Sequence, residues 1–386
     1  MYHRGRGDGT FEPEPITVDL VDGAAMALAS GPGAQFDLVH VSRTGIAIHL
    51  MRSVVRPVLR GGAGSTVRWT SCSPPTSIAT AATTSCSSRA PAGGVGVWWG
   101  GQDEPLARID AHVPGRSIRG LAVADLDGDD DLEAIAVDAT GVIDAYPFAP
   151  RQQVVPIRLA EVGAEVQHLA VADVDGDGRI DLVGLLPSSD GLMRVAVARG
   201  GAALQFAAFA DVAEVASNTH ATLELGDVGG DGDVDILVRA QDARESALVL
   251  AEVPGEWTKP AVLPGHAAMF GPADAVGRVE LVTQEELPSI TTRPASSTGA
   301  CCLQSDDLEG ALLQGVADVD GYGRYDLTVL DEEATHVWLR REDEVARVHL
   351  CDRRLHGNAF ADVDGDGRRD LIGVSSGQLF VRRTRP

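Results

Sequence analysis

Short apolar runs on either side of an acidic turn recur along the chain. Residues 169–172 precede one such turn and residues 181–186 follow it, and residues 315–317 and 326–330 flank another turn in the same way. Short apolar runs bounded by turn residues are typical of buried β-strands. The repeated unit is therefore predicted to be a strand, an acidic turn and a second strand, and the chain is predicted to be all-β.

The acids in the turn have a regular spacing. Residues 173–182 read DVDGDGRIDL and residues 362–371 read DVDGDGRRDL, with acids at positions 1, 3, 5 and 9 and glycine at position 6. Alternate residues of a tight turn aim their oxygens at one point, and glycine allows the sharp bend. Such close carboxylates repel one another unless a hard cation lies among them, and calcium takes about six to eight oxygen ligands. The pattern predicts a repeated calcium-binding loop.

The flanking strands exclude an EF-hand, which requires helices on both sides and a glutamate at position 12. Position 12 is Ala136, Gly184 or Gly373 in three of the loops. The strand, acidic turn and strand pattern, found five times, resembles the FG-GAP or VCBS repeat family, known from the propeller of integrin α subunits. The resemblance spans most of the chain. It implies a β-propeller with calcium in hairpin loops, where position 7 contributes a backbone carbonyl.

The five loops differ in how many ligands they retain. Those that begin at residues 173 and 362 have every side-chain ligand, and the loop at residue 125 has glutamate at position 9 and Asp130 at position 6. Gly229 replaces the acid at position 3 of the loop at residue 227, and Tyr322 replaces the acid at position 5 of the loop at residue 318. Because ligand number tunes calcium affinity, we expect three full sites and two weak or water-completed sites.

The candidate calcium ligands are the acids at positions 1, 3, 5 and 9. The sequence leaves one alternative open, in which these loops are solvated Asp/Gly turns without metal. The candidates are Asp125, Asp127, Asp129 and Glu133; Asp173, Asp175, Asp177 and Asp181; Asp227, Asp231 and Asp235; Asp318, Asp320 and Asp326; and Asp362, Asp364, Asp366 and Asp370.

The repeats are predicted to form one domain over residues 1–386. Worn copies of the loop, expected to bind no metal, begin near residues 29 and 274. One more copy is expected near residue 75, so that eight units are spaced 44 to 54 residues apart. We expect a β-propeller of eight blades, or of seven if one worn copy is an insertion. Residues 7–13 are predicted to complete the C-terminal blade, because closure of the ring shields strand edges.

Residues 51–92 depart from the repeat pattern. Residues 65–92 are rich in Ser, Thr, Ala, Arg and Pro and contain no acid, which is also typical of a disordered linker. When the codons of residues 75–86 are regrouped by one base, with G or C at third positions, the family loop reappears. A single Lys among 32 Lys and Arg residues supports a GC-rich gene. We interpret residues 51–92 as translated out of frame.

The net charge of −24 argues against nucleic-acid binding, which needs basic surfaces. No apolar run is long enough for a membrane-spanning helix. No nucleophile elbow or P-loop is present, and enzymatic activity is not indicated. We expect a monomer with an unknown protein or glycan ligand.

Calcium reaches millimolar levels outside cells, so we expect a secreted or cell-surface protein. No signal peptide is visible, and the native N-terminus is expected to lie upstream. The sequence thus favours a non-enzymatic calcium-binding propeller for protein or glycan binding or adhesion. Two alternatives are the scaffold of a carbohydrate-active enzyme of the polysaccharide lyase type, and a non-functional product of a frame-damaged gene.

Overall fold

The structure is a computed structural model of the 386-residue chain. It describes side chains over part of the chain, and elsewhere it describes only the backbone of strands. Side chains are described for residues 118–128, 133–147, 155–188, 191–216, 221–239, 246–263, 268–271, 279, 281–284, 313–317, 319, 326–330, 334–339 and 346–348.

The described regular structure is β-strand apart from one 3-10 turn, Ala202–Leu204. No helix in the described part of the chain is long and apolar enough to cross a membrane. The strands of the described part of the chain confirm the prediction that the protein is all-β.

Three antiparallel sheets follow one another in the best-described part of the chain. They contain β9 (Ile118–Ala124), β10 (Glu133–Asp138), β11 (Val142–Pro147) and β12 (Ile157–Glu161); β13 (His168–Ala172), β14 (Asp181–Pro187), β15 (Met193–Ala198) and β16 (Ala210–Val215); and β17 (Thr222–Gly226), β18 (Asp235–Arg239), β19 (Glu245–Val249) and β22 (Ala261–Pro264). A small hairpin, β20 (Ala251–Val253) and β21 (Glu256–Trp257), is inserted between β19 and β22.

Two more four-stranded sheets follow along the chain, and the remaining two sheets contain strands from its N-terminal and C-terminal parts. The two four-stranded sheets are β23 (Ala267–Phe270), β24 (Leu281–Glu286), β25 (Ser289–Arg293) and β26 (Cys301–Gln304), and β27 (Leu312–Ala317), β28 (Asp326–Leu330), β29 (Thr335–Arg340) and β30 (Val345–Cys351). A five-stranded sheet contains β4 (Gly23–Gly31), β5 (Gln35–Ser42), β6 (Gly45–Leu50), β7 (Gly93–Trp99) and β8 (Ala107–Arg116).

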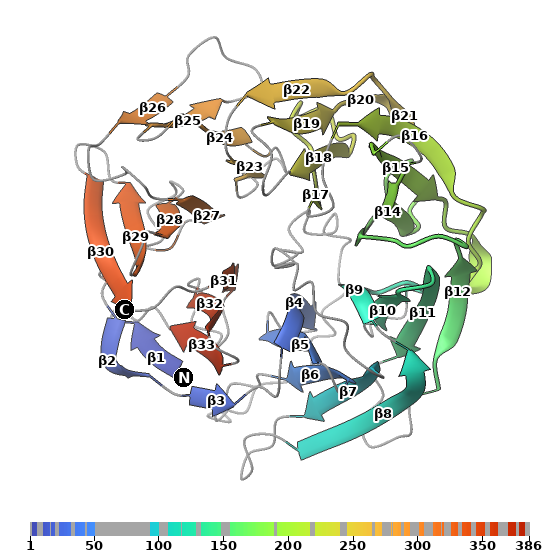
Figure 1. Cartoon of the computed structure of the whole chain (residues 1–386), viewed down its shortest axis with the longest axis horizontal. Helices are drawn as coiled ribbons and strands as arrows, with labels where there is room; N and C mark the ends of the chain where they lie inside the picture. Colours follow the sequence, from blue (N-terminus) through green and yellow to red (C-terminus); the bar gives the residue numbers. More distant parts are fainter. Residues whose placement is uncertain are drawn as a thin grey trace, which may run out of the picture.

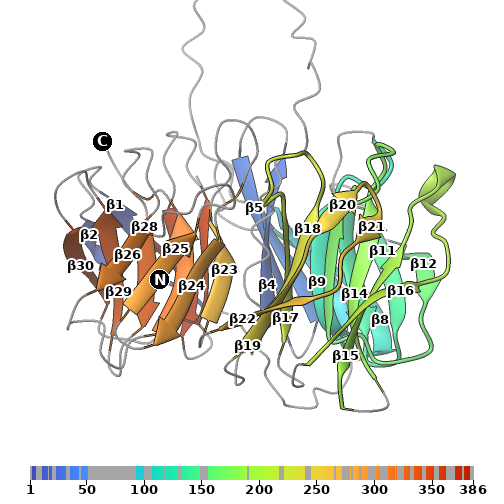
Figure 2. The ribbon, with the colours of Figure 1, turned by 90° about the horizontal axis from the view of Figure 1, so that it is seen from above.

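These sheets stand around a common centre, as Figure 1 shows. Their innermost strands contact one another in a cycle that runs from β4 through β9, β13, β17, β23, β27 and β31 (His356–Ala361) back to β4. Radial sheets arranged in a ring are the architecture of a β-propeller. The view from the side in Figure 2 shows the strands of the sheets running roughly alongside one another.

The two chain ends share one sheet. The C-terminal strands β31 (His356–Ala361), β32 (Asp370–Ser375) and β33 (Gln378–Arg382) are joined by β1 (Tyr2–Gly5) and β3 (Thr17–Asp19), both of which pair with β33. The N-terminal segment thus completes the C-terminal sheet. Strand β2 (Phe11–Pro15) pairs with β1 at the edge of the same sheet, so residues 11–13 of the predicted segment 7–13 lie in the C-terminal sheet.

The described strands form seven sheets of four or more strands besides the β20–β21 hairpin. The predicted eighth unit, near residue 75, and the segment 51–92 lie outside the described residues. In the structure β6 pairs in parallel with β7, across this segment. The number of blades and the proposed frame error therefore stay predictions.

The apolar core lies between neighbouring sheets. One cluster joins Ile135 of β10 to Leu182 of β14, and a second joins Leu185 of β14 to Ile236 of β18. Strands β10 and β14 are buried along almost their whole length. Strand β14 faces a neighbouring sheet on both sides, since Leu182 belongs to the first cluster and Leu185 to the second. Burial on both faces explains why these strands read as continuous apolar runs and do not alternate.

His168 joins two neighbouring sheets within this core. Its side chain is 2% exposed, and the backbone N–H of Leu223 on β17 donates to its Nδ1 atom at 3.3 Å. Burial lowers the pKa of His168 to about 4, because a charged imidazole would lose its hydration there.

We predict that His168 makes the protein less stable in mild acid. In the unfolded chain this histidine binds a proton below about pH 6.5, but in the folded chain only below about pH 4. Its contribution to the free energy of unfolding is full above pH 6.5 and falls by roughly 3 kcal/mol between pH 6.5 and pH 4. In urea unfolding, the free energy of unfolding of His168→Gln should fall less between pH 6.5 and pH 4 than that of the original protein. Equal pH profiles for the two proteins would contradict this.

Candidate metal centre

The loop between β13 and β14, residues 173–181, is built around its first carboxylate. Asp173 Oδ1 accepts hydrogen bonds from the N–H groups of Gly176 and Asp177 at 2.8 and 3.1 Å, and Oδ2 accepts one from Gly178 at 2.8 Å. Gly176 and Gly178 have φ angles of 73° and 84°, which other residues rarely adopt. The sequence places glycine where the loop bends around Asp173.

Three carboxylates meet in this loop. One oxygen each from Asp173, Asp175 and Asp177 lies within 4.8 Å of the others. Negative charges at such distances repel one another, and Arg179, 2.8 Å from Asp177, and Arg199, 3.4 Å from Asp175, offset that repulsion in part. Carboxylate oxygens are also the donors that calcium prefers. The donor set therefore fits a calcium ion, which these three acids would hold.

Asp181, at position 9, is not part of this group. It is fully buried at the start of β14, where its Oδ2 accepts from Val174 N–H at 3.0 Å and its Oδ1 accepts from Gly200 N–H at 2.7 Å. Burial raises the pKa of Asp181, and the two backbone hydrogen bonds oppose that rise. Asp181 thus ties its loop to the end of the third strand of the same sheet.

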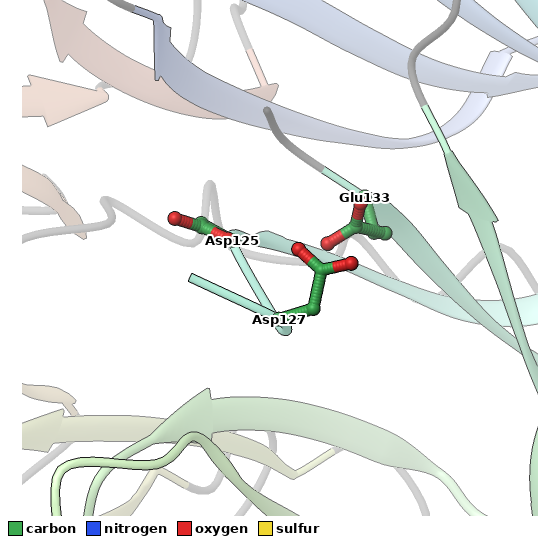
Figure 3. A group of neighbouring side chains, drawn as sticks. All are labelled: Asp125, Asp127 and Glu133. Carbon is green, nitrogen blue, oxygen red and sulfur yellow. The ribbon is translucent and has the colours of Figure 1, made fainter. Parts of the chain in front are cut away.

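The loop after β9 has a second group of three acids. One oxygen each from Asp125, Asp127 and Glu133 lies within 4.8 Å of the others. Figure 3 shows the carboxylates of Asp127 and Glu133 facing one another across the loop. Asp125 accepts from Gly128 N–H at 2.7 Å, which is the same kind of turn that Asp173 makes. The glutamate at position 9 joins the acidic group here, whereas the shorter Asp181 does not.

The loop after β17, residues 227–235, keeps the turn but not the acidic group. Asp227 accepts from the N–H groups of Gly230, Asp231 and Gly232, at 2.5 to 3.2 Å. Position 3 is Gly229, and the described residues of this loop do not form a group of three acids like the other two. Asp231, its other predicted ligand, takes part in the turn through its N–H.

A second role of the position-9 acid was missed by sequence reasoning. In all four loops where it is described, one oxygen accepts from the backbone N–H of position 2, at 2.7 to 3.0 Å. Asp235 accepts from Ala251 N–H with its other oxygen at 2.7 Å, as Asp181 does from Gly200. The only signal in the sequence is that this acid begins an apolar strand. The four acids are Glu133, Asp181, Asp235 and Asp326.

The remaining predicted ligands lie outside the residues whose side chains the structure describes. They are Asp129, Asp318, Asp320, Asp362, Asp364, Asp366 and Asp370. Their assignment as calcium ligands stays a prediction.

We predict that Asp181→Ala destabilises the protein even without metal. Two N–H groups, of Val174 and Gly200, would lose their acceptor, and each unsatisfied buried group costs about 1–3 kcal/mol. Urea unfolding in the presence of a chelator should show a loss of about 2–6 kcal/mol. Asp211→Ala, which removes an exposed partner of Arg194, is the matched control and should cost under about 1 kcal/mol. Equal losses for both variants would refute this role.

Comparisons with known proteins agree with this geometry. The family model described as an FG-GAP-like repeat matches residues 173–238, which include the Asp173 and Asp227 loops. No curated protein sequence matches the chain.

Among the solved structures that resemble the chain, two illustrate the likeness, both at low sequence identity. One is described as the recognition of non-reducing terminal N-acetylglucosamine by an Agrocybe aegerita lectin; it is 14% identical with a TM-score of 0.52, over 69% of this chain and 79% of the lectin. The other is BBS1N in complex with ARL6DN, 10% identical with a TM-score of 0.53, over 95% of this chain and 94% of that one. At these identities the likeness shows the fold alone. The predicted resemblance to FG-GAP repeats is confirmed by the family match over residues 173–238.

Proposed function

We propose that this chain is a calcium-stabilised β-propeller, without enzymatic activity, that binds a protein or glycan outside the cell. The observation that carries the proposal is the pair of three-acid groups in the Asp125 and Asp173 loops, each with its oxygens within 4.8 Å. The net charge of −24 makes neutralisation by divalent ions favourable. Millimolar calcium outside cells would also fill weaker loops, such as the one at Asp227.

The position of the loops supports a binding role. Each described acidic loop connects the innermost strand of its sheet to the second strand, so the loops of successive sheets gather at the same end of the ring. A bound ion would hold each hairpin in one conformation, which lowers the entropy lost when a ligand binds across several loops. The lectin and the BBS1N complex share this fold with the chain, which supports a binding protein without naming its ligand.

In the metal sites the protein's own residues supply the oxygens and orient them. Asp173, Asp175 and Asp177 would hold one ion, and Asp125, Asp127 and Glu133 would hold another. Calcium would supply positive charge that offsets the repulsion among these acids. The backbone N–H groups on Asp173 and Asp125 fix the loop around that point.

We predict that the chain binds at least two calcium ions and that calcium raises its melting temperature. A ligand that binds only the folded state adds about 2.7 kcal/mol per site at a hundred times its dissociation constant. Calorimetric titration and thermal unfolding measure both effects. Asp175→Asn and Asp127→Asn should each weaken one site, while Asp211→Asn leaves the titration unchanged. Fewer than two ions per chain, or a melting temperature indifferent to chelator, would refute the proposal.

We predict that the calcium-loaded protein retains a partner without changing it. In the glycan test, plant or bacterial polysaccharides are passed over the immobilised protein. A chelator is the control, because it should release any bound polysaccharide. Retention without cleavage supports glycan binding. The appearance of unsaturated sugar ends would contradict the non-enzymatic proposal and indicate a lyase.

A further inference from the structure

The β20–β21 hairpin lies between two acidic loops of neighbouring sheets. On its own sheet it is bound to the Asp227 loop, because Ala251 N–H donates to Asp235 Oδ1 at 2.7 Å. The indole Nε1–H of Trp257 donates to the Val234 carbonyl of the same loop at 3.3 Å. Both ends of the hairpin are thus tied to residues 234 and 235.

The tip of the hairpin contacts the Asp173 loop of the preceding sheet. Gly255 N–H donates to the carbonyl oxygen of Val174 at 3.0 Å. Pro254 packs over Gly176, since a Cβ placed on Gly176 would lie 3.4 Å from the Pro254 Cβ. Val174 and Gly176 stand at positions 2 and 4 of the acidic loop, between its carboxylates.

Arg199 strengthens this contact from a third direction. Its Nη1 atom lies 3.4 Å from Asp175 Oδ2, and its Nη2–H donates to the Gly255 carbonyl at 3.2 Å. The Asp175 side chain is only 12% exposed as a result of this packing, although its loop is at the surface. The guanidinium therefore connects a predicted calcium ligand to the tip of the hairpin.

Gly255 is needed for this close approach. Its φ angle is 78°, and a Cβ there would lie 2.7 Å from Arg199 Nη2 and 3.0 Å from Asp175 Cβ. Replacing Gly255 by alanine would therefore strain the backbone at this position, displace the flexible Arg199 guanidinium and crowd Asp175, without changing any charge.

We propose that this hairpin couples the two loops, so that calcium in the Asp173 loop stabilises the hairpin and, through it, the Asp227 loop of the next sheet. The inference rests on the proposed calcium function. Calcium would fix Val174 and Asp175, the residues that Gly255 and Arg199 contact. The Asp227 loop lacks the acid at position 3, so its conformation depends more on contacts with neighbouring segments. Because coupling between sites is reciprocal, a displaced hairpin weakens calcium binding at the Asp173 loop by the same factor.

Hydrogen exchange of the full chain over a series of calcium concentrations tests the coupling. Three segments report on it: residues 174–181, 228–234 and 251–257. In the original protein, calcium should slow exchange in all three segments at the midpoint of the Asp173 loop, below the calcium concentrations that fill the weaker Asp227 loop. In Gly255→Ala the midpoint for residues 174–181 should move to about fivefold higher calcium, and residues 251–257 should lose their response. Gly163→Ala is the matched control, since Gly163 also has a positive φ, of 71°, but open space around it.

A second variant keeps the test independent of backbone strain. Arg199→Gln should also abolish the response of residues 251–257, and Arg199→Lys should restore only part of it, because one ammonium cannot bridge Asp175 and Gly255 as the guanidinium does. Arg194→Gln, which removes an exposed pair with Asp211 in the same sheet, should leave all three segments unchanged.

The outcomes separate this inference from the proposed function. If calcium protects residues 174–181 while residues 251–257 do not respond, or if Gly255→Ala leaves the midpoint in place, the coupling is overturned and the calcium function stands. If calcium protects none of the three segments and calorimetry detects no binding, the calcium function fails and the coupling fails with it.

Discussion

Backbone N–H groups converge on the first carboxylate of each described acidic loop, and the shape of the loop follows from these bonds. Asp173 and Asp227 each accept three of them, and glycines with positive φ provide the bends that bring the N–H groups round. The acid at position 9 then joins the loop to the strands. Hydrogen bonds to a charged acceptor are stronger than those between neutral groups, so the turn can keep its shape in water.

This arrangement concentrates negative charge at the ends of strands whose apolar faces pack together. In the Asp173 loop three N–H groups donate to Asp173, while Asp175 and Asp177, close beside it, accept one each. The apolar clusters between sheets hold the strands in place, and each cluster joins residues of neighbouring sheets. A repeat architecture of this kind transmits order from one unit to the next through such interfaces.

Much of this could be read from the sequence. The strand before and after each loop was predicted from apolar runs, and Asp173, Asp175 and Asp177 were predicted to meet because alternate residues of a tight turn face one point. The role of Asp181 could not be predicted, because the N–H of Gly200 comes from a strand end that is adjacent only in the folded sheet. Gly255 carries no motif, and its importance depends on the position of Arg199. The N-terminal segment was assigned to the right sheet, but the pairing of β1 and β3 with β33 was not predicted, because the sequence pattern does not determine which strands are neighbours.

The most direct test is a crystal structure of the protein grown with calcium, with ions located by their anomalous scattering. The account predicts one peak among Asp173, Asp175 and Asp177 and another among Asp125, Asp127 and Glu133, each about 2.3–2.6 Å from carboxylate oxygens. Loops without a peak, with these acids turned outward into solvent, would contradict it.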